Sequence, residues 1–568
     1  MPEARRLTGP HLLDDRTGAA LDMPLGDDSD ALVPLWEAET RRLLDAVGWE
    51  REITGTHRFS GGVSLFLSAP VDALYAATDV AEEAWHAAVA RHAGQLPDAA
   101  APARLSGLIR EERRPHVRLL ARAAEAHGVT FLHDSDGVSV GTGAGAVFFP
   151  HDGIPEPEDV DWRTVHDVPL VLVTGSNGKT TSVRLIAAMA EAAGLITGSA
   201  TTDGVVIGGS LVAADDFSGP MGARRVLRHA AVRCAVLETA RGGILRRGLA
   251  VRHADAALLT NIAEDHFGDW GVNSLEELAD VKLVIARVVR EGGVVCLNAD
   301  DPILALRGAT LSRKPQWFSL DADAPLLADG DAAWLDGTSL MLRRGGETVS
   351  IMDVRNVPLT LRGAARYNIA NVLGAVLAAS SLRGRDGTPL IPLDAMRAAL
   401  ERFESTPERN PGRGNLFEVG GVHVLVDYAH NPHGMAALTQ MISALPARRR
   451  LILLGQAGDR TDEALRALAR SAWALSPDRI ILKEMDAYRR GRPEGQVQDV
   501  LEDELRTLGA APDRIERADT EIEAARSALA WAEEGDLLIL LLHEKRNQVT
   551  ALLDEIRRSS WSVGAEVP

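Results

Sequence analysis

The sequence predicts an α/β protein with three parts: a small α+β N-terminal domain, a central domain with a mostly parallel sheet, and a Rossmann-like C-terminal domain. From residue 168 onwards, short apolar runs alternate with helix-like segments, as in a sheet that is buried on both faces. A second such series begins after Pro411, which predicts a separate domain. We therefore expect domains at residues 1–165, 166–407 and 408–568.

Length and composition limit the classes of function. A chain of 568 residues is too long for one core, and its 46% hydrophobic and 25% charged residues are typical of a globular protein. The net charge of −19 argues against nucleic acid or an anionic membrane as the main partner. A nucleotide stays open, because it needs only a local positive site.

Cysteine usage and apolar runs bear on the compartment. Cys234 and Cys296 both lie in apolar, strand-like segments, so no disulfide framework is implied. The first ten residues lack the apolar run of a signal peptide, and the most apolar stretch, 537–542, is too short to span a bilayer. We expect a cytoplasmic protein that does not bind membranes.

The N-terminal part shows elements but no recognisable chemistry. Helices are expected at 32–47, 73–92 and 117–127, a strand at 62–67, a linker at 95–103 and a hairpin at 138–149. Gly141-Thr-Gly-Ala-Gly145 has the spacing of a nucleotide-binding turn. No lysine follows it and no helix opens after it, so a plain turn is favoured.

The central domain is organised around a phosphate-binding loop. The segment Gly175-Ser-Asn-Gly-Lys-Thr-Thr181 lies between an apolar strand and a helix expected from Val183. Gly175 and Gly178 let backbone N–H groups approach phosphates, Lys179 would reach the terminal phosphates, and the Thr180 hydroxyl would bind Mg²⁺. Val173 stands where a full Walker motif has glycine, so this is the shorter G-x-x-G-K-T-T loop.

Further strands are expected to deliver polar residues to the same edge of the sheet. Central strands are predicted at 170–173, 235–238, 256–259 and 293–298, with a β-rich excursion at 322–357. Thr174, Glu238, Asn261 and Asn298 stand at their ends, where ligands bind in open α/β sheets. C-terminal strands are predicted at 423–426, 450–454, 479–482 and 537–541, and helices at 461–475 and 521–533.

Each of the following residues has a purely structural interpretation beside the functional one. Glu238 suits a Mg²⁺–nucleotide site, but a strand-end carboxylate is more often merely solvated. His266 can ligate a metal or hold a turn. Lys282, on a predicted helix, is by default a surface lysine.

The motifs in their order resemble the Mur ligase superfamily, the ATP-dependent amide-forming ligases of peptidoglycan, folate polyglutamate and cyanophycin synthesis. The resemblance covers about 168–550. Its motifs are the loop 175–181, Thr260-Asn-Ile262 with Asp265-His266, Asn368-x-x-Asn371, and Asp427-Tyr-Ala-His430. The Mur-ligase-like half of the cyanophycin synthetases looks most similar, through Glu238-Thr-Ala-Arg-Gly-Gly-Ile-Leu-Arg246, Asn410-Pro-Gly-Arg-Gly-Asn415, Gly458-Asp-Arg460 and Arg490-Gly-Arg-Pro493. The ATP-grasp domain of those enzymes is missing, with only a remnant of its beginning before residue 165.

The resemblance implies a P-loop ATPase as the central domain and assigns roles to individual residues. The ATP phosphates and nucleoside would be held by Gly175, Ser176, Asn177, Gly178, Lys179, Thr180, Thr181, Asn368, Asn371, Arg413 and Asp427. Thr180, Glu238 and His266 would ligate Mg²⁺, and Lys282 corresponds to the lysine that many Mur ligases carry as a carbamate. The catalytic set would be Lys179, Glu238, His266, Lys282 and Arg413. Substrates would be contacted by Thr202, Asp203, His430, Asp486, Arg490 and Arg492.

The resemblance also implies the reaction: an ATP-dependent ligase would join an amine to a carboxylate through an acyl phosphate. The acceptor would be peptide-like or aspartate-type, and arginine is a candidate amine because Glu484 and Asp486 can pair a guanidinium. A catalytically silent partner of another ligase, and a peptidoglycan- or folate-type ligase, are the alternatives. We expect a homo-oligomer, a separate ATP-grasp ligase as partner, or both. The apolar face at 73–85 fits an oligomer contact or an intramolecular interface equally well.

Overall fold

The N-terminal domain is an antiparallel sheet covered by helices. The computed structural model describes residues 3–24, 26, 29–264, 267–384, 386–559 and 561–567. The sheet has the order β1-β2-β4-β3. Its strands are β1 (Arg5–Leu7), β2 (Gly18–Pro24), β3 (Thr54–Phe59) and β4 (Gly62–Ser68). Helices α1 (Ser29–Ala46) and α2 (Leu74–His92) pack on it, and the alanines of α2 lie in its core with Trp36. The apolar face expected at 73–85 is therefore covered within the chain.

A second small unit connects this domain to the centre. Helix α3 (Ala101–Glu112) occupies part of the segment predicted as a linker, and α4 (Pro115–Ala126) follows. Strands β5 (Phe131–His133), β6 (Gly137–Val140) and β7 (Val147–Pro150) form an antiparallel sheet, which confirms the hairpin. The glycines at 143–145 form one 3₁₀ turn, as the plain-turn interpretation predicts.

The central sheet is mostly parallel, as predicted. Its order is β11-β10-β9-β12-β8-β13-β14-β15-β16-β17-β18, and the pairs from β9 through β16 are parallel. The parallel strands are β8 (Leu170–Thr174), β9 (Thr197–Thr201), β12 (Cys234–Glu238), β13 (Ala254–Leu259), β14 (Val289–Asn298), β15 (Gln316–Ser319) and β16 (Ala332–Asp336). Antiparallel strands extend both edges: β10 (Gly204–Ile207), β11 (Ser210–Ala213), β17 (Ser339–Arg344) and β18 (Glu347–Asp353). The β-rich excursion thus belongs to the central sheet.

Helices cover both faces of the central sheet. One face packs against α5 (Lys179–Ala192), α11 (Arg366–Ser381) and α12 (Leu393–Arg402). The other packs against α6 (Pro220–Leu227), α7 (Arg241–Arg247), α8 (Leu275–Lys282), α9 (Val284–Arg287) and α10 (Pro302–Gly308). Helix α5 begins four residues before the predicted start, so Lys179, Thr180 and Thr181 already belong to its first turn.

The C-terminal domain is a second parallel sheet with helices on both faces. Its order is β19-β20-β24-β21-β22-β23, and only the β19–β20 pair is antiparallel among the described residues. The strands are β19 (Arg413–Val419), β20 (Val422–Asp427), β21 (Arg450–Leu454), β22 (Arg479–Lys483), β23 (Ile515–Ala518) and β24 (Leu537–Leu541). One face carries α13 (Pro432–Ser443), α14 (Asp462–Trp473) and α15 (Gln496–Thr507), and the other α16 (Glu521–Trp531) and α17 (Arg546–Arg558). This arrangement confirms the predicted Rossmann-like class.

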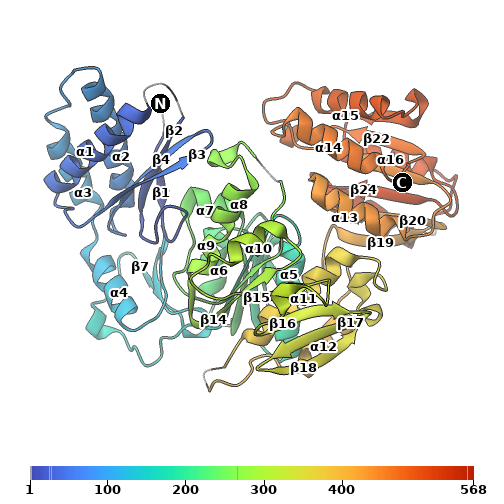
Figure 1. Ribbon diagram of the computed structural model, residues 1–568, viewed down its shortest axis with the longest axis horizontal. Coiled ribbons are helices and arrows are strands. Elements are labelled where there is room, and N and C mark those ends of the chain that lie inside the picture. The colour runs from blue at the N-terminus through green and yellow to red at the C-terminus, as the bar shows by residue number, and fades with distance from the viewer. Residues whose placement is uncertain are drawn as a thin grey trace.

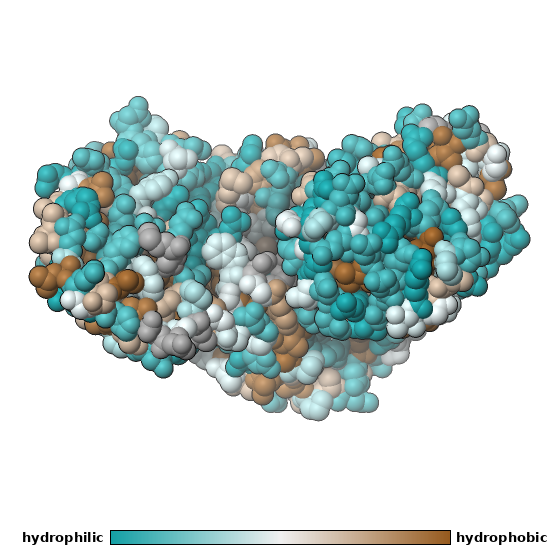
Figure 2. Space-filling model, turned by 90° about the horizontal axis from the view of Figure 1, so that it is seen from above, coloured by the Kyte–Doolittle hydropathy of each residue, from teal (hydrophilic) through white to brown (hydrophobic). Residues whose placement is uncertain are grey.

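The three parts form a bent arrangement with the central domain in the middle (Figure 1). The N-terminal and C-terminal sheets lie on opposite sides of it. The face in Figure 2 is dominated by hydrophilic residues, and apolar ones appear in small separate groups. Within the described residues, no helix combines the length and apolar character that a membrane crossing requires. The domain limits near 165 and 407 stay predictions.

Candidate active site

The loop after β8 requires glycine at two positions. Gly175 and Gly178 have φ values of +148° and +84°, in the region that glycine adopts without strain. A Cβ atom would lie 1.8 Å from Thr260 Oγ1 at position 175 and 2.2 Å from Asn371 Oδ1 at position 178. Gly178 also directly precedes the first turn of α5. The N–H groups of that turn have no partner within the helix and point out of its N-terminal end, towards the loop. The loop has the form of an anion-binding helix start.

The side chains between the glycines hold the loop in place. Ser176 Oγ donates to the Ala263 carbonyl at 2.8 Å and accepts from its N–H at 2.9 Å. The Asn177 amide forms a reciprocal pair with Asn431 of the C-terminal domain, at 3.0 and 3.3 Å. Ser176 and Asn177 therefore shape the loop, and Asn177 also ties it to the other domain.

The first turn of α5 faces the carboxylate at the end of β12. Thr180 Oγ1 donates to Glu238 Oε2 at 2.8 Å and lies 3.4 Å from the Thr202 hydroxyl. Lys179 Nζ donates to the Ser176 carbonyl at 3.1 Å, so its ammonium lies over the loop. Thr181 is buried, with its hydroxyl 3.5 Å from Asn410 Nδ2. The Lys179 ammonium, the Thr180 hydroxyl and the Glu238 carboxylate thus lie at the same end of the sheet, where the sequence predicts a phosphate and metal site.

Glu238 has an open coordination position. The side chain is 3% exposed, and its Oε1 has no hydrogen-bond partner within the described residues. Burial raises the pKa of Glu238, although the Lys179 charge and the Thr180 hydroxyl oppose the shift. A buried carboxylate oxygen without a partner suits a cation, so Thr180 and Glu238 fit a Mg²⁺ site. His266, the third predicted ligand, and Asp265 lie outside the described residues.

Lys282 is buried and faces the phosphate loop. It ends α8, is 2% exposed, and donates to the Gly175 carbonyl at 2.8 Å. The surface-lysine interpretation is therefore wrong. Helix α8 turns this lysine inward because its apolar residues pack against the sheet, which brings the end of the helix beneath the loop.

Asparagines from two elements close the inner side of the loop. Asn371 of α11 donates to Asn368 Oδ1 at 3.2 Å, and Asn368 donates to the Leu359 carbonyl at 3.1 Å. Both side chains are buried. Asn261, two residues after the end of β13, accepts from the Asn177 N–H at 2.9 Å and donates to the Asn177 carbonyl at 3.0 Å.

The C-terminal domain presents a cation and a carboxylate to the same space. Arg413, at the start of β19, pairs in register with Asp427 of β20, and its guanidinium lies 4.4 Å from the Tyr428 ring centroid. Burial raises the pKa of Asp427, opposed by the charge of Arg413 and by backbone N–H groups. His430 Nδ1 lies 3.1 Å from the Tyr428 carbonyl.

These groups line one cavity of about 820 Å³ between the central and C-terminal domains. The lining residues from the central domain are Ser176, Asn177, Gly178, Lys179, Thr180, Thr181, Thr202, Glu238, Lys282, Asn368 and Asn371. The predicted residues that line it from the C-terminal domain are Arg413, Asp427, His430 and Arg490. The structure therefore brings together most of the residues predicted from the sequence.

The family models match the same two domains. Residues 173–379 match the Mur ligase middle domain, and residues 412–541 match the Mur ligase glutamate ligase domain. The chain belongs to the Mur ligase family.

Relatives agree with this membership. The cyanophycin synthetase of Crocosphaera subtropica is 38% identical over 66% of this chain and 42% of its own length, so the chain spans about two fifths of that relative. The UDP-N-acetylmuramoyl-L-alanyl-D-glutamate–2,6-diaminopimelate ligase of Xanthomonas oryzae is 27% identical over 78% of this chain and 90% of its own length. FolC of E. coli, solved in complex with DHPP and ADP, has a TM-score of 0.51 at 19% identity, covering 68% of this chain and 89% of that chain. This last likeness supports the Mur ligase fold.

Other predicted substrate residues of this Mur ligase chain have structural partners. Asp203 accepts from Arg184 at 2.9 Å and from Arg546 at 2.7 Å, and so joins the two domains. Arg492 bonds to the carbonyls of Gly458 and Arg460 and to Asp462. Asp486 lies 3.2 Å from Arg489, and neither Asp486 nor Arg492 lines the cavity. Of the 483–493 loop, Met485, Tyr488 and Arg490 line it.

The cavity also contains residues that the sequence reasoning missed. The Arg413 guanidinium lies over the Tyr428 ring, and the His543 ring meets the Tyr428 ring edge-on with their centroids 5.0 Å apart. Arg460 and His433 also line this side of the cavity. Tyr428 belongs to the motif Asp427-Tyr-Ala-His430, which was the signal for it in the sequence. His543 lies two residues after the end of β24, and the rule that ligands bind at strand ends was the signal for it.

Proposed function

We propose that this protein is an ATP- and Mg²⁺-dependent carboxylate–amine ligase. One observation carries the proposal: Lys179, Thr180 and Glu238 on one wall and Arg413 on the other face a single cavity between two domains. A phosphoryl group held there would meet a cation from each domain. The Mur ligase membership, and the ADP found in the FolC neighbour, support the same reaction class.

The chemistry follows from the poor reactivity of a carboxylate. Hydroxide is a poor leaving group, so an amine does not displace it at neutral pH. Transfer of the terminal phosphoryl group of ATP to the acceptor carboxylate gives an acyl phosphate and ADP. The amine then attacks the acyl carbon, and phosphate leaves as the amide forms. Catalysis of the first step is mainly positioning and charge neutralisation, which suits Lys179 and Arg413.

The remaining residues have supporting roles in this proposal. Thr180 and Glu238 would hold Mg²⁺, with His266 as a further ligand, and the ion would neutralise phosphate charge. Asn368 and Asn371 would contact the nucleobase, and Asp427 the ribose. Lys282, as a carbamate or as an amine, would support the phosphate loop from beneath through its contact with Gly175. A C-terminal domain that covers the cavity would keep the acyl phosphate from water.

The substrates belong to the proposal as well. We propose a peptide-like carboxylate acceptor and an amino-acid amine, with arginine as one candidate. Thr202 and His430, which line the cavity, are candidate substrate contacts. A separate ATP-grasp ligase is the proposed source of the acceptor, and a homo-oligomer stays a prediction.

Replacement of Lys179 tests the reaction class. Lys179→Ala should lower amine-dependent ADP release by at least about 100-fold, because a cation facing the transferred charge is lost. Candidate amines and acceptors would be screened with ADP detection and mass spectrometry of the products. Lys314→Ala is the matched control, since this lysine is exposed, pairs with Asp329 and does not line the cavity. Normal turnover by the Lys179 variant would overturn the proposal.

A further inference from the structure

A series of buried hydrogen bonds lies behind the part of the cavity wall that carries Arg413. Strands β20, β24, β21 and β22 are parallel neighbours, so their carboxyl ends meet at one edge of the C-terminal sheet (Figure 1). Lys483 is the last residue of β22, and its side chain crosses the end of β21 towards β24. Gly455, directly after β21, leaves room for it, because a Cβ atom there would lie 2.5 Å from Lys483 Cγ.

The Lys483 ammonium uses all three of its donors. It donates to Glu521 and to the Leu541 carbonyl, and its third partner is His543 Nδ1 at 3.1 Å. An ammonium has no acceptor, so Nδ1 of His543 must accept. The ring hydrogen then lies on Nε2, which is 3.3 Å from the Ala429 carbonyl and donates to it. Lys483 thus fixes both the tautomer and the orientation of the His543 ring.

The His543 ring is neutral in these surroundings. Its side chain is 4% exposed, and burial together with the Lys483 charge lowers the pKa of His543 well below its usual value. A second proton, on Nδ1, would face the ammonium. The ring therefore serves as a hydrogen-bond donor of fixed orientation at neutral pH.

His543 holds the turn that follows β20. Its Nε2 donates to the Ala429 carbonyl, and the Ala429 N–H donates to Asp427 at 2.7 Å. The His543 ring also meets the Tyr428 ring edge-on, with the centroids 5.0 Å apart. The Arg413 guanidinium lies over that tyrosine ring, 4.4 Å from its centroid. A shift of His543 would therefore move the ring on which Arg413 rests.

Arg413 needs this support because its guanidinium has little else to hold it. Within the part of the chain that the structure describes, it forms one hydrogen bond, to the Gly412 carbonyl at 3.3 Å. Its position otherwise depends on the Tyr428 ring and on the nearby charge of Asp427.

We infer that Lys483 is a positioning residue for Arg413 and acts through His543 and Tyr428. The inference rests on the proposed function, in which Arg413 neutralises charge on the transferred phosphoryl group. Lys483 is 1% exposed and does not line the cavity, so it does not touch the nucleotide itself. Its loss should affect nucleotide binding only where Arg413 contributes, at the terminal phosphate of ATP.

Two nucleotides separate this role from a general loss of structure. ADP lacks the terminal phosphate, and the β,γ-imido analogue of ATP carries it. Calorimetric titration of the whole protein with each nucleotide and Mg²⁺ compares Lys483→Met and His543→Phe with the unchanged protein, and Arg413→Gln is the reference. Arg449→Met is the matched control. It also removes the cation of an ion pair with a buried carboxylate, Asp536, at the opposite end of β21 and β24.

We expect Lys483→Met and His543→Phe to weaken binding of the ATP analogue at least about fivefold and binding of ADP less than about twofold, because a charge-assisted contact is misplaced. Arg449→Met should change neither by more than about twofold. The double variant Arg413→Gln/Lys483→Met should bind the analogue no more weakly than Arg413→Gln alone, since both changes act at one arginine. Thermal melting checks that each variant folds.

Three results would overturn the inference. The Lys483 and His543 variants could weaken both nucleotides equally, they could match the Arg449 control, or the double variant could lose the sum of the single effects. In each case a selective loss in Arg413→Gln leaves the proposed function standing. If Arg413→Gln itself binds the analogue as tightly as the unchanged protein does, the proposed role of Arg413 is wrong, and the inference falls with it.

Discussion

Gly178 and Gly194 have the same φ of +84° in different surroundings. A Cβ atom at 178 would lie 2.2 Å from Asn371 Oδ1, whereas at 194 nothing lies within 4 Å. Alanine at either position carries the same backbone strain, about 1–2 kcal/mol. Only at 178 must the site also move, because Asn371 is held by Asn368 on a buried helix.

The comparison of these two glycines gives a residue-scale prediction. Gly194→Ala should lower the free energy of unfolding by about 1–2 kcal/mol. Gly178→Ala should cost roughly 1–3 kcal/mol more and should weaken ADP binding, since the loop shifts. Chemical denaturation and calorimetric ADP titration measure the two effects. Equal losses of stability in the two variants, with ADP binding intact in both, would contradict the crowding of Gly178 by Asn371.

At the scale of elements, a buried ion pair joins strands β22 and β24 to helices α16 and α17. Lys483 and Glu521 are fully buried and hydrogen-bond to each other. Lys483 also donates to the Leu541 carbonyl and lies 3.1 Å from His543 Nδ1. Glu521 accepts from the N–H groups of His543 and Lys545 at 2.6 and 2.5 Å, so it also holds the turn before α17.

Lys483 and Glu521 should contribute unequally to the free energy of unfolding. Without Lys483 the carboxylate keeps two N–H donors, whereas without the Glu521 charge the ammonium is left in a buried site. Burial already lowers the pKa of Lys483 against the effect of Glu521. We expect Glu521→Gln to cost about 3–5 kcal/mol of unfolding free energy and Lys483→Met to cost less. Urea denaturation of both variants and of the double variant measures this, and a larger cost for Lys483→Met would refute it.

Most elements could be predicted from the sequence because their apolar patterns are local. The strands 170–173 and 450–454 match β8 and β21 to within one residue. Helix α3 was not predicted, because the segment that contains its start is rich in proline and alanine. Pro102 is accommodated in the first turn, where a backbone N–H would lack a partner anyway. Helix α5 starts early because the positive φ of Gly178 lets the chain enter the helix directly from the loop.

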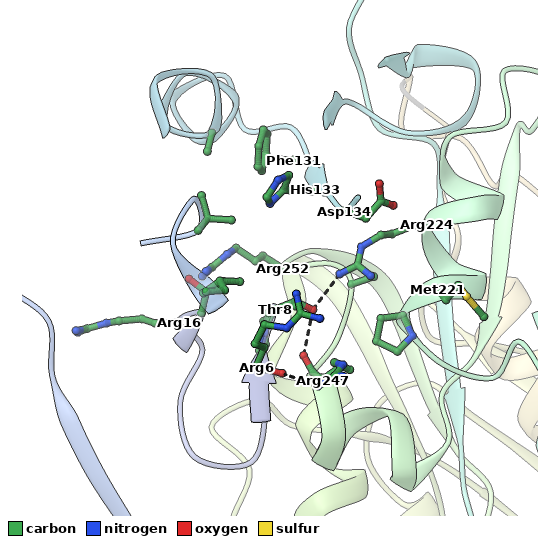
Figure 3. A pocket seen from close by; sticks show the side chains of 18 of the residues that line it. Arg6, Thr8, Arg16, Phe131, His133, Asp134, Met221, Arg224, Arg247 and Arg252 are labelled. Carbon is green, nitrogen blue, oxygen red and sulfur yellow. Dashed lines mark hydrogen bonds between the residues drawn. The ribbon is translucent and has the colours of Figure 1, made fainter. Parts of the chain in front are cut away.

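At the scale of the whole molecule, the site depends on contacts that a local pattern cannot reveal. Asn177 and Asn431 pair although 254 residues separate them, and 343 residues separate Asp203 from Arg546. The order of the motifs predicted which residues meet in the cavity, but not that Asp203 joins the domains. The burial of Lys282 likewise depends on how α8 packs, and the cavity lined by Thr8, Asp134 and Arg224 (Figure 3) requires three parts of the chain at once.

Asp203 is the residue at which the two domains are held together by charge. Its carboxylate accepts from Arg184 of α5 and from Arg546 of α17, and its side chain is 8% exposed. Burial alone would raise the pKa of Asp203, but the charges of Arg413, Arg546 and Arg184 lower it below its usual value. A lowered pKa means that this stabilisation is present at neutral pH and is lost on acidification below about pH 4.

Asp203→Asn should therefore loosen the contact between the domains. Arginines that share one counter-charge would face each other without it, at a cost of about 3–5 kcal/mol. We expect a larger radius of gyration in small-angle X-ray scattering at neutral pH and faster proteolysis of the segment 403–412. Asp394→Asn, at an exposed pair with Arg397, is the control. If Asp203→Asn matches this control in both measurements, the domains are held by other contacts, of which the Asn177–Asn431 amide pair is the next to test.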